Sequence, residues 1–197
     1  MMNVQPVVLE GTYVKLEPLS QGHHQALCEV GLDTVLWKYT TTQVQSSEDM
    51  KRYIATALTW QSEGTALPFV IIEKPSGIVV GSTRYANIDV TNKRMEIGWT
   101  WIARPWQRTA INTEAKYLLL THAFENLGCM RVEFKTDVLN VQSRNALTRI
   151  GAKEEGVFRN HMITQTGRIR NTIYFSIIDS EWPGVKLRLT DMMNQQR

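Results

Sequence analysis

The chain has 197 residues, 43% of them hydrophobic, which suits one domain with a substantial core. Its formal net charge of +3 is too small to predict nucleic-acid or membrane binding from bulk electrostatics. No apolar run reaches the roughly 20 residues of a membrane helix, and the first ten residues lack the layout of a signal peptide. The two cysteines, Cys28 and Cys129, do not make a disulfide framework. We therefore expect one cytoplasmic domain over residues 1–197 that binds neither nucleic acid nor membranes.

The first half of the chain predicts two helices followed by a run of strands. Ser20 is placed to cap a helix that ends near Val30, and Ser46 opens a second helix with the pattern of a capping box. Alternating apolar residues and turn-forming clusters predict the strands. These strands are expected at residues 12–17, 67–73, 78–86 and 95–102. Short turns join the last three, so the sheet should begin antiparallel.

The second half alternates helices and strands. The expected elements are a helix at 113–127, a strand at 131–136, a helix at 141–150, strands at 152–163 and 169–178, and a terminal helix from Ser180. A helix separates the strands 95–102 and 131–136, so these two should pair in parallel. Apolar residues cover most of the helix 113–127, which predicts that it is buried. The whole pattern is that of a mixed α/β domain.

The loop between the strand 95–102 and the helix that follows is a candidate anion site. A helix N-terminus leaves several backbone N–H groups unpaired, and the helix dipole adds positive potential there. Arg104 and Arg108 flank this loop and are suited to neutralising a phosphate. Gly98 interrupts the preceding strand, as happens at a bulge or where another group approaches the backbone closely. Ordinary α/β architecture without a ligand explains a loop of this kind equally well.

Five short motifs occur in a recognisable order along nearly the whole chain. They are Leu9-Glu10-Gly11 with Val14, Leu16, Pro18 and Leu19; Glu96-Ile97-Gly98-Trp99; Thr113-Glu114-Ala115; Ala123-Phe124-Glu125 with Leu127 and Gly128; and Asp137 with Asn140 and Ser143. With them the chain resembles the GNAT superfamily of acyl-CoA-dependent N-acetyltransferases, in its RimJ/RimL-like branch. The resemblance implies an α/β domain with a central mixed, mostly antiparallel sheet that is splayed in the middle and flanked by helices.

The resemblance also implies acetyl-CoA as co-substrate, without a metal. The residues it assigns to the cofactor are Trp101, Ile102, Ala103, Gln107, Arg108, Thr109, Ala110, Ile111, Asn112, Asn140 and Ser143. The family's pyrophosphate loop carries glycine where this chain has Ala110 and Asn112, and glycine lets phosphate approach the backbone. Asn112 is suited to capping the helix with its side chain.

Two residues are candidate general bases. Glu96 begins the central strand and is suited to accepting the amine proton directly or through water. A solvent-facing strand end, or an ion pair with Arg84 or Arg94, explains this glutamate as well. His161 lies in a late strand that, by resemblance, borders the acceptor, and histidine transfers protons near neutral pH. A structural histidine remains the alternative.

The remaining expectations concern the leaving group and the acceptor. Ser143 is placed to bond the departing sulfur or to serve only as a helix residue, and the tyrosine that many GNAT proteins carry one turn later is Leu147 here. Trp37, Tyr39 and Trp60 are candidates for the acceptor pocket, with core packing as the alternative. We expect transfer of acetyl to a primary amine, either a protein N-terminus or a small molecule, in a ternary complex. The alternative is a non-catalytic acyl-CoA-binding module. A homodimer is common among similar proteins.

Overall fold

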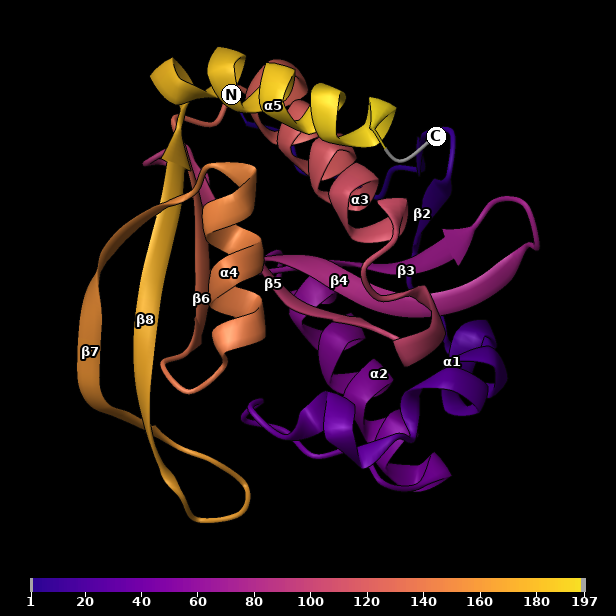
Figure 1. The fold of residues 1–197 in the computed structure, drawn as a ribbon. Coiled ribbons are helices and arrows are strands. Elements are labelled where there is room, and N and C mark those ends of the chain that lie inside the picture. The colour runs from indigo at the N-terminus through magenta and orange to yellow at the C-terminus, as the bar shows by residue number, and fades with distance from the viewer. Residues whose placement is uncertain (1, 196–197) are drawn as a thin grey trace.

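The computed structural model describes residues 2–195, which form one eight-stranded sheet with helices on both faces (Figure 1). The strands are β1 (Leu9–Glu10), β2 (Val14–Pro18), β3 (Leu67–Glu73), β4 (Ile78–Asp89), β5 (Arg94–Ile102), β6 (Arg131–Asp137), β7 (Lys153–Ile163) and β8 (Ile169–Ile178). Their spatial order is β1-β2-β3-β4-β5-β6-β8-β7. Every neighbouring pair is antiparallel except β5 and β6, which are parallel as predicted.

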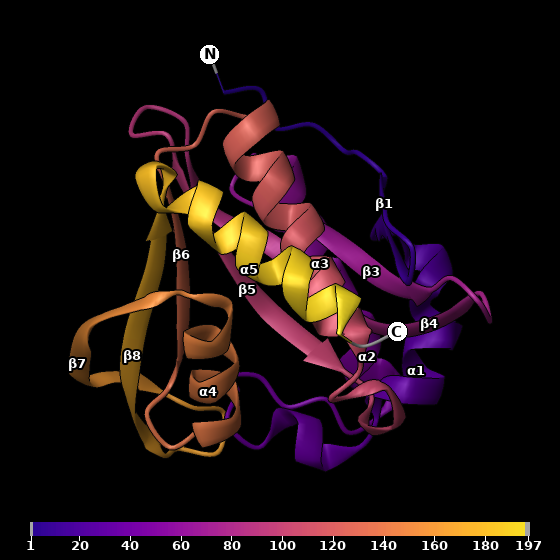
Figure 2. The same cartoon turned by 45° about the horizontal axis from the view of Figure 1, so that its top comes forward.

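Five α-helices surround the sheet. They are α1 (His24–Gly31), α2 (Ser47–Ser62), α3 (Ala110–Thr121), α4 (Val141–Ile150) and α5 (Trp182–Asn194), with short turns η1 (Gln21–His23), η2 (Thr34–Trp37), η3 (Arg104–Trp106), η4 (His122–Asn126, π-helical) and η5 (Asp179–Glu181). One core lies between the sheet and α1 and α2, and a larger one lies under α3, α4 and α5. Figure 2 shows α5 lying beside α3, where Trp182 stacks on Phe124 with ring centroids 5.5 Å apart.

The sheet opens between its two central strands. β5 and β6 pair only at Arg94 with Arg131, Met95 with Val132 and Glu96 with Glu133. Beyond Glu96 each strand continues without the other, so the predicted splay is confirmed. β5 carries a bulge against β4 at this point, and Trp99 takes a left-handed φ of 50° within it. The bulge redirects the free part of β5 away from β6.

α3 begins earlier than the sequence predicts. Thr109 caps its first turn by accepting a hydrogen bond from the N–H of Ile111, so Asn112 lies inside the helix and does not cap it. The cap predicted at Ser46 is confirmed, because its side chain accepts from the N–H of Asp49 at the start of α2. Ser20 precedes the turn η1 and does not cap α1, which begins only at His24. α4 begins with the Asn140 side chain as its cap and ends at Gly151, which has a φ of 98°.

Glu114 fastens the start of the sheet to α3. Its carboxylate accepts hydrogen bonds from the backbone N–H groups of Thr12, Tyr13 and Val14 at 2.6–2.8 Å. Gly11 lies against it, and a Cβ there would be 2.4 Å from Glu114 Cδ. The motif around Gly11 and the motif that contains Glu114 are therefore in direct contact in the structure. Among the described residues, no helix is long and apolar enough to cross a membrane.

Candidate functional site

The part of β5 that has no partner presents backbone N–H groups to the gap. Because the N–H of Ala103 donates to Val80 of β4 at 2.8 Å, this residue is turned away from β6. Strand alternation then turns the N–H groups of Ile102 and Thr100 toward the gap. The carbonyl of Ile102 already accepts from the Gln107 side chain at 2.8 Å. Of the three residues expected to touch a cofactor here, Trp101 packs its ring into the core under α2 and its backbone pairs with Ser82 of β4.

The loop before α3 supplies further unpaired donors. The N–H groups of Arg108, Thr109 and Ala110 donate to no protein acceptor within residues 2–195. Arg108 has a left-handed φ of 60°, whereas Ala110 and Asn112 are helical. The two positions where the family carries glycine therefore need no glycine conformation in this chain. Free amides at the N-terminus of a twelve-residue helix fit a phosphate group.

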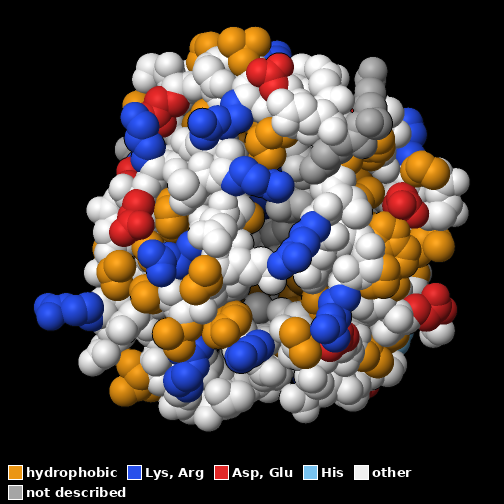
Figure 3. Space-filling view, viewed as in Figure 1, with side chains coloured by type: hydrophobic (Ala, Val, Ile, Leu, Met, Phe, Trp, Pro, Cys, Tyr) orange, Lys and Arg blue, Asp and Glu red, His pale blue; other side chains and the backbone are white. Residues whose placement is uncertain are grey.

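The N-terminus of α4 faces this loop across the gap. Gln142 donates to Gln107 at 3.2 Å, and Arg149 donates to Thr113 of α3 at 3.4 Å. The Asn140 side chain accepts from the N–H of Ser143, while the Ser143 hydroxyl has no hydrogen bond in the described chain. Figure 3 shows this face, with basic side chains across its middle and most acidic ones toward the rim. Arg104 is already paired with Asp33 at 3.5 Å.

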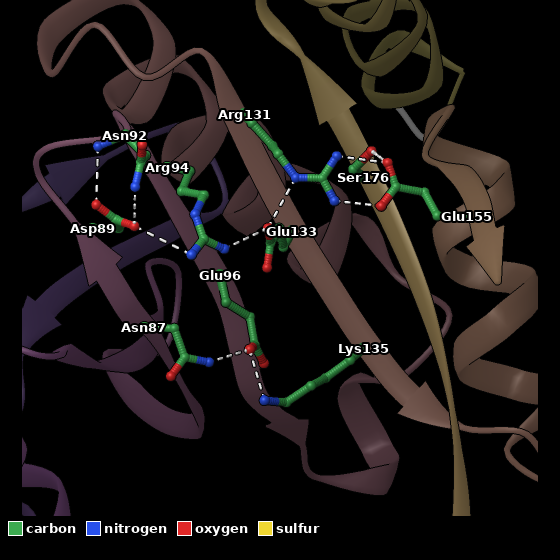
Figure 4. A network of polar contacts seen from close by, with 10 residues as sticks. All are labelled: Asn87, Asp89, Asn92, Arg94, Glu96, Arg131, Glu133, Lys135, Glu155 and Ser176. Carbon is green, nitrogen blue, oxygen red and sulfur yellow. Dashed lines mark hydrogen bonds and ion pairs between the residues drawn. The ribbon is translucent and has the colours of Figure 1, made fainter. Parts of the chain in front are cut away.

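Glu96 lies where the two strands part, and its carboxylate oxygens have different surroundings (Figure 4). Oε2 accepts from Asn87 Nδ2 at 2.7 Å and from Lys135 Nζ at 2.9 Å. Oε1 has no donor among residues 2–195 and lies over Gly98, where a Cβ would be only 2.5 Å away. Both expected alternatives are wrong: Glu96 is 2% exposed, so it is not a solvent-facing strand end, and it pairs with Lys135 and not with Arg84 or Arg94. One oxygen is fixed and the other is free.

The polar network continues along the same face of the sheet. Arg131 donates to both Glu133 and Glu155, and Glu155 also accepts from the Ser176 hydroxyl at 2.8 Å (Figure 4). These carboxylates raise the pKa of the Arg131 guanidinium further, the Glu155 hydrogen bond being the largest cause. The network fixes the paired ends of β5 and β6 relative to β7 and β8.

A cavity of about 110 Å³ lies on the same side of the sheet as Glu96. Its lining residues come from the loop before α2, from α2 itself, from β4 and β5, and from the β7–β8 turn: Thr42, Gln43, Asp49, Arg52, Tyr53, Thr56, Trp60, Arg84, Trp99 and Gln165. Two hydrogen bonds hold the β7–β8 turn against the loop before α2: Gln43 N–H donates to Gln165 Oε1 at 2.7 Å, and Gln165 N–H donates to the Thr41 carbonyl.

The structure separates the three aromatic residues expected in an acceptor pocket. Trp60 lines the cavity. Trp37 is 1% exposed and donates from Nε1 to the Gly31 carbonyl at 2.7 Å, so core packing, the alternative, describes it. Tyr39 is partly exposed beside Lys38 and does not line the cavity.

His161 lies far from Glu96. It is exposed within an irregularity of the edge strand β7, with its ring 5.2 Å from Phe158 and 5.9 Å from Tyr174. Three strand spacings, roughly 14 Å, separate β7 from β5 in the sheet. The two candidate bases are therefore not brought together.

Lys116 of α3 reaches the gap from the opposite face and was not anticipated. Its Nζ donates to Thr100 Oγ1 at 2.9 Å and lies 5.7 Å from the centroid of the Phe134 ring, on the residue that follows the last β6 pair. Burial lowers the pKa of Lys116 to about 7. No carboxylate within residues 2–195 pairs with it. A buried amine thus bridges the two strands just beyond their point of separation.

The cysteines lie outside this site. Burial raises the pKa of the Cys129 thiol to about 11, and its Sγ contacts Met2. Cys28 lies on α1 beside His24, at 3.5 Å from its Nε2. In the described part of the chain, no group of three or more His, Cys, Asp and Glu side chains is arranged to hold a metal ion.

A sheet splayed at its centre, with the free amides before α3 and the N-terminus of α4 facing the opening, defines the acyltransferase class that the motifs indicated. The family model described as "Acetyltransferase (GNAT) domain" matches residues 14–153, so the chain belongs to the GNAT acetyltransferase family. The predicted family is confirmed.

Known proteins agree with this assignment. The Bacillus subtilis protein named "Putative ribosomal N-acetyltransferase YdaF" is 36% identical over 110 residues, which is 56% of this chain and 59% of YdaF, less than two thirds of its length. A GCN5-related N-acetyltransferase from Brucella melitensis has a TM-score of 0.89 at 31% identity, covering 96% of this chain and 86% of that one. RimJ from Mycobacterium smegmatis shares the fold, with a TM-score of 0.80 at 22% identity over 95% of each chain. These relatives are consistent with the RimJ/RimL-like branch.

Proposed function

We propose that this chain transfers an acetyl group from acetyl-CoA to a primary amine by direct attack within a ternary complex. The observation that carries the proposal is the parting of β5 and β6 immediately after Glu96. A carboxylate oxygen, an open strand edge and the free amides before α3 then border one gap. The RimJ structure was determined with CoA-disulfide, which supports coenzyme A as the ligand of this fold.

The chain binds and orients acetyl-CoA mainly through its backbone. The amides of residues 108–110, with Arg108 beside them, hold the pyrophosphate, and the α4 N-terminus with Asn140 borders the arm of the cofactor. The thioester supplies an activated acyl group. The N–H groups of Thr100 and Ile102 donate to the carbonyl oxygen as it gains charge, and donors of this kind are typically worth about 3–4 kcal/mol. Placing the two reactants together contributes about 7–11 kcal/mol.

Glu96 is the general base in this mechanism. Its free Oε1 takes the proton of the attacking amine, directly or through one water, while Lys135 and Asn87 keep Oε2 fixed. We assign the Ser143 hydroxyl, which has no hydrogen bond among residues 2–195, to the departing sulfur. Since neither cysteine lies in the gap, the amine attacks the thioester itself and no acyl-enzyme forms.

Thiol release from acetyl-CoA with a panel of amines tests the proposal. We expect turnover by the parent, and Glu96→Gln should lower kcat about 10²–10⁴-fold while leaving the KM for acetyl-CoA unchanged. His161→Gln is the matched control and should stay near the parent. A parental rate for Glu96→Gln would remove Glu96 as the base. Binding of acetyl-CoA without turnover of any amine would instead favour a non-catalytic acyl-CoA-binding module.

A further inference from the structure

Arg84 is a buried cation that lacks an anionic partner. It is 1% exposed and lies on β4, in the middle of the sheet. Its Nε is buried without a hydrogen bond, and its guanidinium forms no hydrogen bond or ion pair with any of residues 2–195. Buried charges are normally paired, because a charge removed from water pays a desolvation penalty that only a partner offsets.

Aromatic rings compensate this charge only in part. The Arg84 Cζ lies 4.9 Å from the ring centroid of Tyr53, 5.4 Å from that of Trp60 and 5.0 Å from that of Trp99. Rings attract a cation through their faces, but they do not satisfy the five N–H donors of a guanidinium. The rings therefore fix Arg84 in one orientation and leave its donors available. A guanidinium held in this way is suited to binding a carboxylate with two parallel hydrogen bonds.

The cation faces the cavity beside the proposed base. Arg84 lines the cavity and pairs across the strands with Gly98, the residue over which Glu96 Oε1 lies. Side chains in diagonal positions on neighbouring strands are roughly 7–8 Å apart. An amine bound at Glu96 and an anion bound at Arg84 would thus be close enough to be two groups of one small molecule.

We propose that the amine acceptor carries a carboxylate within a few bonds of its amine, and that Arg84 binds this carboxylate. The inference rests on the proposed function, which places the amine at Glu96. The acceptor is then an α-amino acid or a polypeptide whose N-terminal residue has an acidic side chain. A cavity of about 110 Å³ admits a group of that size. The acid in its lining, Asp49, is already bound to Arg52 and Ser46, so the cavity offers no free anion to polyamines or aminoglycosides.

Matched acceptors test the proposal by kcat/KM. Amino acids are compared with their amides, and peptides beginning with Asp or Glu with those beginning with Asn or Gln. The parent should prefer the anionic member of one series at least about tenfold, and the preferred series identifies the acceptor. Arg84→Met should abolish that preference without lowering the melting temperature, and Arg84→Lys should retain part of it. The control is Lys51→Met, an exposed position of α2.

Two outcomes of this comparison would overturn the inference. One is a parent that uses neutral or cationic amines as well as anionic ones. The other is an Arg84→Met variant that melts well below the parent yet keeps the preference, which would make Arg84 structural. Calorimetric titration of the same acceptors into CoA-saturated protein separates failure of this inference from failure of the proposed function. If no amine is acetylated but anionic compounds bind the parent and not Arg84→Met, the anion site at Arg84 is supported and the proposed acetyl transfer is contradicted. If none binds, the inference falls.

Discussion

Because Gly98 has no side chain, one oxygen of the buried Glu96 carboxylate remains available for chemistry. The Glu96 side chain is 2% exposed, and two donors hold one of its oxygens. Gly98 leaves space beside the other oxygen, where any Cβ would collide at 2.5 Å. The glycine that suggested a bulge in the strand thus serves the carboxylate two residues earlier, while Trp99 takes the left-handed conformation of the bulge.

Lys116 gives a test of stability against pH. Burial lowers its pKa from 10.5 to about 7, so between these values the unfolded chain holds one more proton than the folded chain. The free energy of unfolding contributed by this group therefore rises with pH across that window and is lowest below pH 7. Lys116→Met should be more stable than the parent by on the order of 3 kcal/mol near pH 6, with little gain left near pH 10.

Denaturant unfolding of Lys116→Met and the parent at both pH values measures this difference. Lys51→Met, on the exposed side of α2, is the control and should show no pH-dependent gain. An equal gain for Lys116→Met at both pH values would mean that the amine is not titrating in the folded protein. The lower free energy of unfolding of the parent would then have a cause other than the burial of a charged amine at the gap.

At the scale of elements, the contact between Glu114 and the β1–β2 turn should dominate the attachment of the N-terminal strands to α3. Glu114→Ala leaves three backbone N–H groups without their acceptor, so we expect a loss of at least about 3 kcal/mol in the free energy of unfolding. Chemical unfolding measures it, with exposed Glu154→Ala of β7 as the control. A loss below 1 kcal/mol, roughly that of one neutral hydrogen bond, would show that water replaces the carboxylate.

The elements were largely predictable because turn residues and alternation determine their ends. The observed bounds of β3, α4 and β8 equal those expected from the sequence. The start of α3 was misplaced because Thr109 and Asn112 are both good caps, and only the tertiary structure decides between them. β1 was missed since two residues carry no periodicity.

The site was less predictable, because its key contacts join distant parts of the chain. Glu96 could be identified from its strand, but its partners Asn87 and Lys135 depend on a bulge in β4 and on the β5–β6 register. Arg84 and Lys116 did carry a signal in the sequence. Each lies inside an element that contains one other charged residue, Asp89 in β4 and Glu114 in α3. A charged residue in the interior of such an element is paired, costly or functional.

At the scale of the whole molecule, three residue pairs join the two halves of the sheet, β1–β5 and β6–β8. Coenzyme A bound in the gap would contact both halves and tie them together. A ligand that binds only the folded state stabilises it by about 2.7 kcal/mol when present at a hundred times its Kd. We therefore expect coenzyme A to raise the melting temperature and to slow amide hydrogen exchange in β5 beyond Glu96, in β6 beyond Glu133 and at the start of α3.

The matched variant for this experiment is Asn112→Asp, which adds a negative charge to the first turn of α3. It should bind coenzyme A more weakly, because the charge repels the pyrophosphate and competes for the same helix dipole. Exchange in β1 and β2 should not change in either protein, since these strands lie at the far edge of the sheet. Protection at that edge, or unchanged affinity in Asn112→Asp, would place the nucleotide elsewhere. The gap between β5 and β6 would then not be the coenzyme A site.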